Sequence, residues 1–468
     1  MKRLSQLRNL VSSRLRRRSS SMKPVCPADQ LPHELLAYVF SLATEDPAVN
    51  QLALLHITHV CARWRHVALA AQALWGRIVL AFPVSSQQLA YAAAYLVRSG
   101  AHPLDILWDL RDPSWDWDED THRFRWQEMQ HVMRLFLPHF SRWRNVDLLS
   151  DTWAPIFTFL WYTKDVQSGP MLESVSLCRC NAYFAMPGQT FQPNSLRQPI
   201  KLFGGIDLPN LRKITLVGVH INWSQPSVLT GLTHLEFKYL ASDVTPTVEQ
   251  FQSIIEACPQ LDYLSIYGRG PNITTDSPSQ FSMLKLETLS FGFLDTTYAV
   301  QFFSRLYVPN LQKLELEDIS TGVSPTGSVD ASPFLHWFVS EAASDRVPFR
   351  QLQTLELQSI VSTKGDLHSF FGVFPAVLHL ALIDMPEDAL SLLVPPSSPD
   401  FQLQGGSLFP ALQDLRCQDA NPDILIEVVT SRAYIILSIL YRRHLLNLHD
   451  ILHLQLGHFL VYVLRTQA

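Results

Sequence analysis

The chain has 468 residues, of which 47% are hydrophobic and 17% are charged. This charged share lies below the usual ~25%, and glycine is scarce at 18 residues, which excludes a globally disordered or collagen-like protein. Six cysteines without a CxxC pair exclude a disulfide framework and are typical of a reducing compartment, so we expect a cytoplasmic or nuclear protein.

The first 28 residues differ in charge from the rest of the chain. They hold eight Lys or Arg and no acid, which leaves 29 basic against 42 acidic residues in the remainder, a net charge of −13. A body this acidic argues against nucleic acid as a partner, because phosphate binding rests on clustered Lys and Arg. The basic, Ser-rich segment 1–28 fits a disordered tail, a mitochondrial transit peptide or a nuclear address.

Residues 29–80 predict a small helical module. It opens with LPHELLAYVFSLA, whose apolar residues fall on one helical face. Pro32 suits a first-turn position, where its missing N–H costs nothing, and Leu31 then lies near the helix cap. A leucine cannot cap a helix because it offers no side-chain oxygen. Contact with another surface therefore explains Leu31 better at this position. The residues on this face are Leu31, Leu35, Leu36, Val39 and Phe40.

A second helix and a short closing segment complete the module. The closing segment AQALWGRIVL carries Leu74 and Trp75. Large aromatic residues such as Trp64 and Trp75 usually anchor the core of a small module. The apolar stripe of the second helix consists of Leu54, Leu55, Ile57, Val60, Cys61, Trp64, Val67 and Ala68.

The order of LPxELLxxVF, ITHVCARWRHVA and LW resembles an F-box. The long first connection, over residues 44–51, resembles the F-box-like modules abundant in mushroom-forming fungi. The resemblance implies binding to the Skp-type adaptor of an SCF-type cullin–RING ubiquitin ligase. The alternative is that the matched residues only form the core of a three-helix bundle. The residues that match the adaptor-binding motif are Leu31, Pro32, Leu35, Leu36, Val60, Cys61 and Trp64.

Residues 81–140 are expected to link this module to the next domain. The segment 102–110, HPLDILWDL, is an early strand candidate. In residues 109–126, acids and tryptophans alternate and are followed by Arg123 and Arg125. This stretch is either a recognition loop or a solvated acidic loop whose tryptophans cover the end of the following domain.

Residues 141–430 are predicted to form leucine-rich repeats. Apolar residues recur ten times at offsets 0, 3 and 5, as in LxxLxL, and segments such as VEQFQSIIEACP supply helical returns. One repeat cannot bury its own apolar face, so neighbours must stack into a solenoid of parallel strands with helical or loop returns, an α/β fold. A generic α/β fold is the alternative. The first apolar residues of the ten segments are Trp143, Leu172, Leu211, Leu232, Leu261, Leu286, Leu311, Leu352, Val377 and Leu412.

The residues between the apolar positions of each strand should point out of the opposite face. In F-box/leucine-rich-repeat proteins, by resemblance, targets dock on this concave face, and tyrosines are frequent at binding hot spots. The alternative is that these outward residues are ordinary solvated strand residues without a binding role. The candidates for target binding are Tyr263, Tyr267, Lys313 and Glu315. The other outward residues that we expect are Glu236, Lys238, Ser265, Glu317, Glu356 and Arg416.

Residues 431–468 depart from the repeat pattern. They are rich in Leu and His, and they are either an amphipathic capping helix pair or a gene-model artefact, such as retained intron sequence. Charged residues break their apolar run below the ~20 residues of a membrane span, so no membrane partner is expected. His449 and His453 could share a helix face, but a third ligand is missing, so no metal site is predicted.

No nucleotide-binding, zinc-protease or serine-hydrolase motif is present. We therefore expect no enzyme, no catalytic residues and no cofactor. The sequence favours an F-box substrate receptor that binds a Skp-type adaptor, hence a cullin–RING complex, and positions an unknown protein target. The alternatives are an F-box/leucine-rich-repeat scaffold outside a ligase and an enzyme hidden in the insertions.

Overall fold

The computed structural model divides the chain into two compact units. The helical unit comprises residues up to 79 together with 94–102, and the repeat unit comprises residues 80–93 and those from 103 onward. The basic segment 1–28 and the histidines of the C-terminal segment lie outside the described residues. The structure describes residues 30–44, 53–180, 189–224, 228–273, 280–322, 327–344, 349, 351–394, 408–418, 421–431, 436–440 and 461–464.

The helical unit is held together by one apolar cluster. Trp75 is fully buried in it, and its indole N–H donates to the Ala68 carbonyl at 2.8 Å. The core position expected for Trp75 is confirmed. The elements are α3 (His33–Ala43), α4 (Ala53–Val60), α5 (Ala62–Ala70) and a 3₁₀ helix (Gln72–Trp75). The cluster consists of Leu36, Phe40, Leu54, Ile57, Val67, Ala68 and Trp75.

The single second helix that we expected is two helices, α4 and α5. Cys61 separates them with an extended backbone (φ −157°, ψ 169°). Its Sγ accepts the Trp64 N–H at 3.4 Å and so caps α5. Apolar periodicity continues across the break, which is why the sequence pattern did not reveal it.

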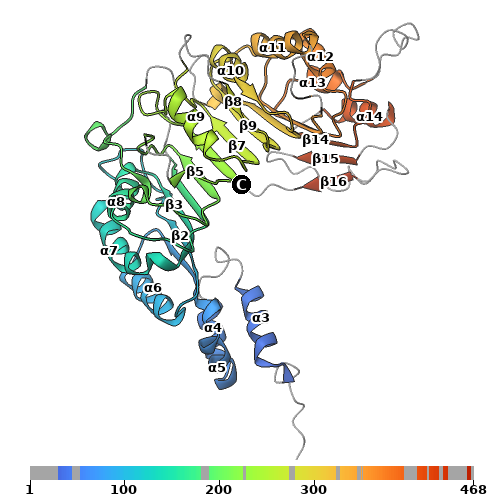
Figure 1. Ribbon diagram of the computed structural model, residues 1–468. Coiled ribbons are helices and arrows are strands. Elements are labelled where there is room, and N and C mark those ends of the chain that lie inside the picture. The colour runs from blue at the N-terminus through green and yellow to red at the C-terminus, as the bar shows by residue number, and fades with distance from the viewer. Residues whose placement is uncertain are drawn as a thin grey trace, which may run out of the picture. The chain divides into compact units, whose positions relative to one another are not determined.

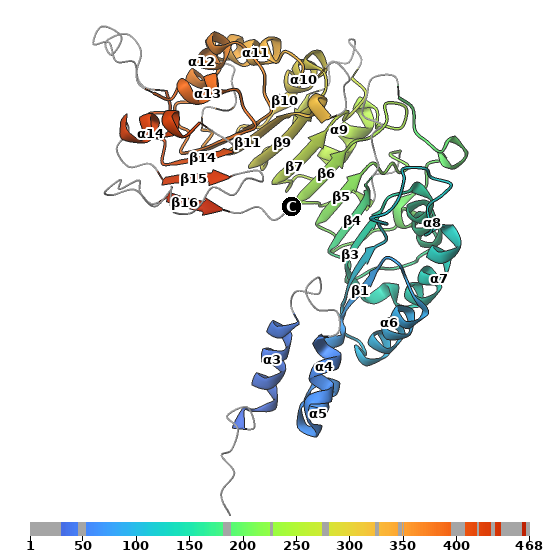
Figure 2. The same cartoon turned by 180° about the vertical axis from the view of Figure 1, so that it is seen from behind.

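The repeat unit is built on a sheet whose strand order follows the chain (Figures 1 and 2). Each strand from β2 onward pairs in parallel with its neighbours. The long strands are β1 (Arg77–Ala81), β2 (Leu104–Asp109), β3 (Trp143–Ser150), β4 (Ser174–Arg179), β5 (Lys213–Val217), β6 (His234–Lys238), β7 (Tyr263–Tyr267), β9 (Thr288–Phe293), β11 (Lys313–Asp318), β12 (Thr354–Gln358), β13 (His379–Ile383), β14 (Asp414–Gln418), β15 (Ile436–Leu440) and β16 (Val461–Leu464). A small second sheet pairs β8 (Phe281–Ser282) with β10 (Leu306–Tyr307).

Helical returns cover one face of this sheet, and none of the described helices of the repeat unit lies on the other face (Figures 1 and 2). We call the uncovered face the open face. Polar side chains cap the first turns of two return helices. Thr247 and Gln250 form a capping box for α9, and Asp295 caps α10. The helices are α6 (Ser86–Arg98), α7 (Trp126–Phe136), α8 (Trp153–Thr163), α9 (Val248–Glu256), α10 (Thr296–Phe303), α11 (Ser332–Ala343), α12 (Lys364–Gly372), α13 (Glu387–Ser391) and α14 (Pro422–Ser431).

The predicted LxxLxL triads form the core of the repeat unit. All ten triads are buried, and their second and third residues align across the sheet, for example Leu264 with Leu289 and Leu289 with Leu314. Each such leucine stabilises the fold by roughly 1.5–3 kcal/mol through burial. The leucine-rich-repeat solenoid expected from the sequence is therefore observed, and 102–110 contains β2 as predicted.

The C-terminal segment differs from one of its two expected forms. Residues 436–440 and 461–464 are strands that extend the sheet from β14, not members of a helix pair. A parallel sheet edge offers free N–H and C=O groups, and added strands satisfy them. The rest of 432–468 lies outside the described residues.

Candidate functional site

Helix α3 presents one apolar face to the core and a second one to solvent. Leu36 and Phe40 are buried. The outward apolar side chains lie three, four and seven residues apart, a spacing that places them on one side of a helix. Exposed apolar patches of this kind mark interaction sites on soluble proteins. We call these residues the α3 stripe: Leu35, Tyr38, Val39 and Leu42, which are 47–61% exposed.

The three other residues predicted at the start of α3 have different surroundings. Pro32 is exposed and occupies the N-cap, one residue earlier than expected. Leu31 is half-buried against the core, and its carbonyl accepts a hydrogen bond from the Arg63 guanidinium. Leu36 departs from the expected adaptor-facing position. Its side chain is only 1% exposed because it lies on the inner face of α3, so we assign it to the core.

The predicted residues around the α4–α5 break also separate into contact and support positions. Val60 is 60% exposed and Cys61 is exposed, so both side chains are available to a partner. Trp64 is half-buried and packs its ring against Phe40 at a centroid distance of 5.0 Å. Trp64 therefore supports α3, in line with the core role expected for it.

Sequence reasoning did not identify Tyr38 and Leu42 as site residues. It assigned α3 a single apolar face, whereas the helix is apolar on nearly all sides. A helix of that kind is normally buried all round. Its occurrence in a small helical unit was the available signal that the second apolar face is exposed.

On the open face, the outward residues of successive strands lie in three continuous rows. Tyr263 pairs with Thr288 and Lys313 with Thr288, so Tyr263 and Lys313 lie two strands apart in the first row. Glu315 belongs to the second row and Tyr267 to the third. The structure thus brings all four predicted target-binding residues to one face, over β7 to β11.

Both tyrosines on the open face are fixed by side-chain contacts. The Tyr263 ring stacks on His234 with 4.0 Å between centroids. The Tyr267 hydroxyl bonds to Ser290 at 3.1 Å, and the Lys238 ammonium lies 4.8 Å from the Tyr267 ring centroid. Rigid, half-buried aromatic rings lose little side-chain entropy on binding, which favours a contact role.

The open face becomes more acidic from β6 to β11 and β12. At β6, burial alone would raise the pKa of Glu236, but hydrogen bonds from His234 and Lys238 hold that pKa at about 2. At β11 and β12, burial raises the pKa of both Glu317 and Glu356. Lys313 pairs with Glu315 and lies 4.0 Å from Glu356, so one cation serves several carboxylates there.

The acidic, Trp-rich loop at residues 109–126 is anchored to the repeat unit. The Glu119 carboxylate forms an ion pair with Arg179, which is only 1% exposed. Trp115 is half-buried with its ring 5.5 Å from that of His122, whereas Trp117 is 59% exposed. The loop therefore has features of both expected alternatives, because one tryptophan packs and another faces solvent.

Within the described ranges, no cluster of three or more His, Cys, Asp or Glu side chains could hold a metal ion. None of the helices among these residues has the length and apolarity of a membrane span.

Comparisons with known proteins give a match for the helical unit. Residues 28–81 match the F-box-like family model. No curated protein matches the chain. Among solved structures, the chain resembles the crystal structure of a TLR13–ssRNA13 complex with 14% identity and a TM-score of 0.27, over 72% of this chain and 52% of that one. The chain thus spans about half the length of that structure.

These modules favour interaction over catalysis. F-box-like and leucine-rich-repeat folds are typically non-catalytic, and both are present here. The N-terminal helices form an F-box-like domain, which supports a role in protein–protein interaction.

Proposed function

We propose that this protein is the substrate receptor of an SCF-type cullin–RING ubiquitin ligase. Its F-box-like domain binds a Skp-type adaptor, and its open face binds a target protein. The observation that carries the proposal is the α3 stripe, an apolar surface without a partner in the described structure, within a domain that matches the F-box-like model. The receptor acts by holding target lysines at a high effective concentration near the transfer site.

The proposed adaptor contacts are Leu31, Pro32, Leu35, Val60 and Cys61, together with the rest of the α3 stripe. Leu36 and Trp64 support these residues from the core side. On the target side, the proposed contacts are Tyr263, Tyr267, Lys313 and Glu315. We propose action in the cytoplasm or nucleus, where the adaptor-linked machinery operates.

Co-purification with a Skp-type adaptor tests the proposal. A Leu35→Asp variant, and a Leu31→Ala/Pro32→Ala double variant, should each weaken capture about tenfold or more, since burying one leucine contributes roughly 1.5–3 kcal/mol. The matched control is Leu284→Asp, the same change at an exposed leucine of the repeat unit. Circular dichroism verifies folding. Equal capture by folded wild type and Leu35→Asp contradicts the adaptor assignment.

The alternative function is an F-box/leucine-rich-repeat scaffold that acts outside a ligase. The two functions differ in the step after adaptor capture. A receptor retains the cullin through the adaptor and supports ubiquitin transfer to a bound target in a reconstituted reaction. A scaffold retains the adaptor without recruiting the cullin. Replacement of Tyr263 and Tyr267 by Ala should abolish target modification while adaptor capture stays unchanged.

A further inference from the structure

A polar cavity lies at the carboxyl edge of three neighbouring strands of the repeat unit. The segments that come after β6, β7 and β9 converge there, and they enclose about 180 Å³. Ligands commonly bind beyond the carboxyl ends of parallel strands, where successive loops meet. Cavities for drug-sized ligands measure about 300–1,000 Å³. This cavity therefore suits one small group and is too small for a nucleotide.

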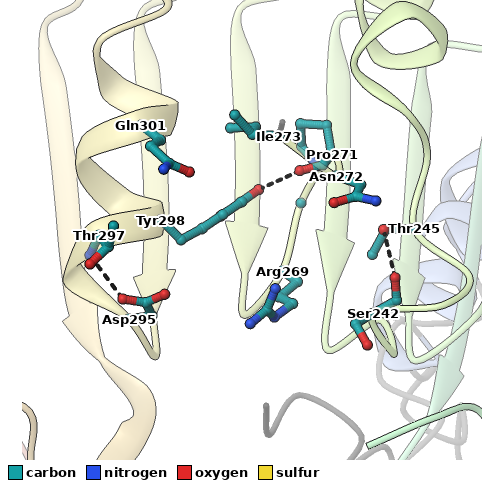
Figure 3. Close-up of a pocket in the computed structure, with 11 residues that line it drawn as sticks. Ser242, Thr245, Arg269, Pro271, Asn272, Ile273, Asp295, Thr297, Tyr298 and Gln301 are labelled. Atoms are coloured by element: carbon teal, nitrogen blue, oxygen red, sulfur yellow. Dashed lines mark hydrogen bonds between the residues drawn. The ribbon is translucent and has the colours of Figure 1, made fainter. Parts of the chain in front are cut away.

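Several donors that line the cavity are unpaired. None of the residues that the structure describes forms a hydrogen bond or ion pair with the half-buried Arg269 guanidinium, and the same holds for the side-chain amides of Asn272 and Gln301. Figure 3 shows all three side chains around the same space. A guanidinium stays charged in proteins and offers five donors, and no described residue pairs with those of half-buried Arg269.

The cavity wall is kept in place by independent contacts. The Tyr298 hydroxyl donates to the Pro271 carbonyl at 3.0 Å (Figure 3). Gly270 leaves room for that hydroxyl, because a Cβ at this position would lie 2.9 Å from it. The Asn272 N–H donates to the Pro246 carbonyl at 2.8 Å and ties the β7 segment to the β6 segment. The backbone that carries Arg269 and Asn272 is thus held in position before any ligand arrives.

A carboxylate also lines the cavity. Asp295 uses Oδ1 to accept the Thr297 N–H at 2.9 Å, which leaves Oδ2 for a ligand (Figure 3). A fully deprotonated anion meets repulsion from this carboxylate. A ligand with negative oxygens for Arg269 and an O–H for Asp295 satisfies both side chains, and a hydrogen phosphate group has both features.

We propose that this cavity binds a phosphate group, with its oxygens on Arg269 and its O–H donated to Asp295. The group comes either from inorganic phosphate or from a phosphorylated side chain, and it fills a space that the adaptor and open-face contacts do not use. This inference does not rest on the proposed ligase function.

Isothermal titration of the full chain with inorganic phosphate, sulfate and phosphoserine at pH 7.5 tests the site. Sulfate carries no proton at this pH, so wild type should prefer phosphate. Phosphoserine, mostly deprotonated with its second pKa near ~6, should bind more weakly than phosphate if the free ion is the ligand. Equal or tighter binding of phosphoserine at pH 7.5 overturns the O–H contact with Asp295, because its phosphate then carries no proton. At pH 5.5, where most of it carries one proton, equal or tighter binding than phosphate assigns the site to a phosphorylated side chain.

Three variants separate recognition from folding. Arg269→Ala should weaken phosphate binding about tenfold or more, because a charge-assisted pair is lost. Asp295→Asn keeps a good capping residue for α10 and should remove the preference for phosphate over sulfate. The control Arg134→Ala, at an exposed arginine of α7, should change nothing. Absence of saturable phosphate binding to folded wild type overturns the proposal, as does unchanged binding by Arg269→Ala.

Discussion

At the scale of single residues, the open face owes its shape to small side chains beneath large ones. Gly292 lies beside the Tyr267 ring, and Ser265 and Ser290 are buried next to it. A Cβ at Gly292 would lie 2.5 Å from Tyr267 Cδ1, closer than a real Cβ contact allows. Position 292 therefore requires a glycine, because any side chain there would clash with the Tyr267 ring, which lies over β9.

Gly292→Ala should destabilise the protein by about 1–3 kcal/mol, because the Tyr267 ring must leave its position and its hydroxyl must release Ser290. The matched control is Gly372→Ala at the end of α12, where a new Cβ meets nothing within 4 Å. There we expect a gain of up to about 1 kcal/mol from helix propensity. Urea unfolding of the three proteins measures both effects. A neutral Gly292→Ala would show that Tyr267 is not fixed.

At the scale of elements, the core strands were predictable from the sequence, and the surfaces that the strands and their connections form were only partly predictable. The LxxLxL pattern located each core strand because a parallel ladder forces equivalent residues, such as Leu264 and Leu289, into one buried row. The same alternation placed Tyr263 and Lys313 on the open face. These features depend on local spacing, which a sequence displays directly.

Features that depend on distant contacts were not predictable. The anchoring of the acidic loop joins Glu119 to Arg179, far apart in the chain, so no local pattern reveals it. One local feature was also missed, because the break at Cys61 left the apolar period unchanged. The cavity around Arg269 arises because three loops meet, and each loop alone reads as an ordinary polar turn.

The acidic loop is also the element whose docking should depend on pH. Buried His122 contacts Asp151 through Nε2 at 3.1 Å and the Phe124 carbonyl through Nδ1 at 3.0 Å, and Asp112 lies close by. Burial alone would lower the pKa of His122, but these contacts outweigh it and raise that pKa above 6.5. The charged imidazole therefore stabilises the docked loop.

Because the folded-state pKa of His122 is raised, its stabilising effect is complete below about pH 6.5 and is lost as pH rises through the folded-state value. Asp151→Asn should reduce this dependence, since the amide cannot stabilise an imidazolium. The measurement is the free energy of unfolding at pH 6 and pH 8 for both proteins. Equal differences between the two pH values in wild type and variant would exclude His122 as the source.

At the scale of the whole molecule, the repeat unit is a one-dimensional array. Among the described residues, each strand of the large sheet from β2 onward pairs only with the strands next to it in the sheet order. Stability in such an array is approximately a sum of repeat terms and nearest-neighbour interface terms. A local defect should therefore weaken its own repeat and the adjacent ones before distant repeats.

Leu314→Ala tests this expectation at the centre of the array. Leu314 is fully buried in β11, between Leu289 and Leu355, and its truncation should cost about 2–5 kcal/mol. Hydrogen exchange measured by mass spectrometry should show lost protection in β9, β11 and β12, with β3 and β4 unchanged. The matched variant Leu235→Ala removes the equivalent leucine of β6 and should move the loss to β5, β6 and β7.

The two variants together decide between an array and a single cooperative body. If either substitution lowers protection uniformly from β2 to β14, the repeats unfold as one unit, and coupling spreads through the shared helical layer. If the losses stay with the mutated repeat, a target bound over β7 to β11 stabilises only that part of the solenoid. Target binding could then be located by the strands that gain protection, without knowing the target contacts in advance.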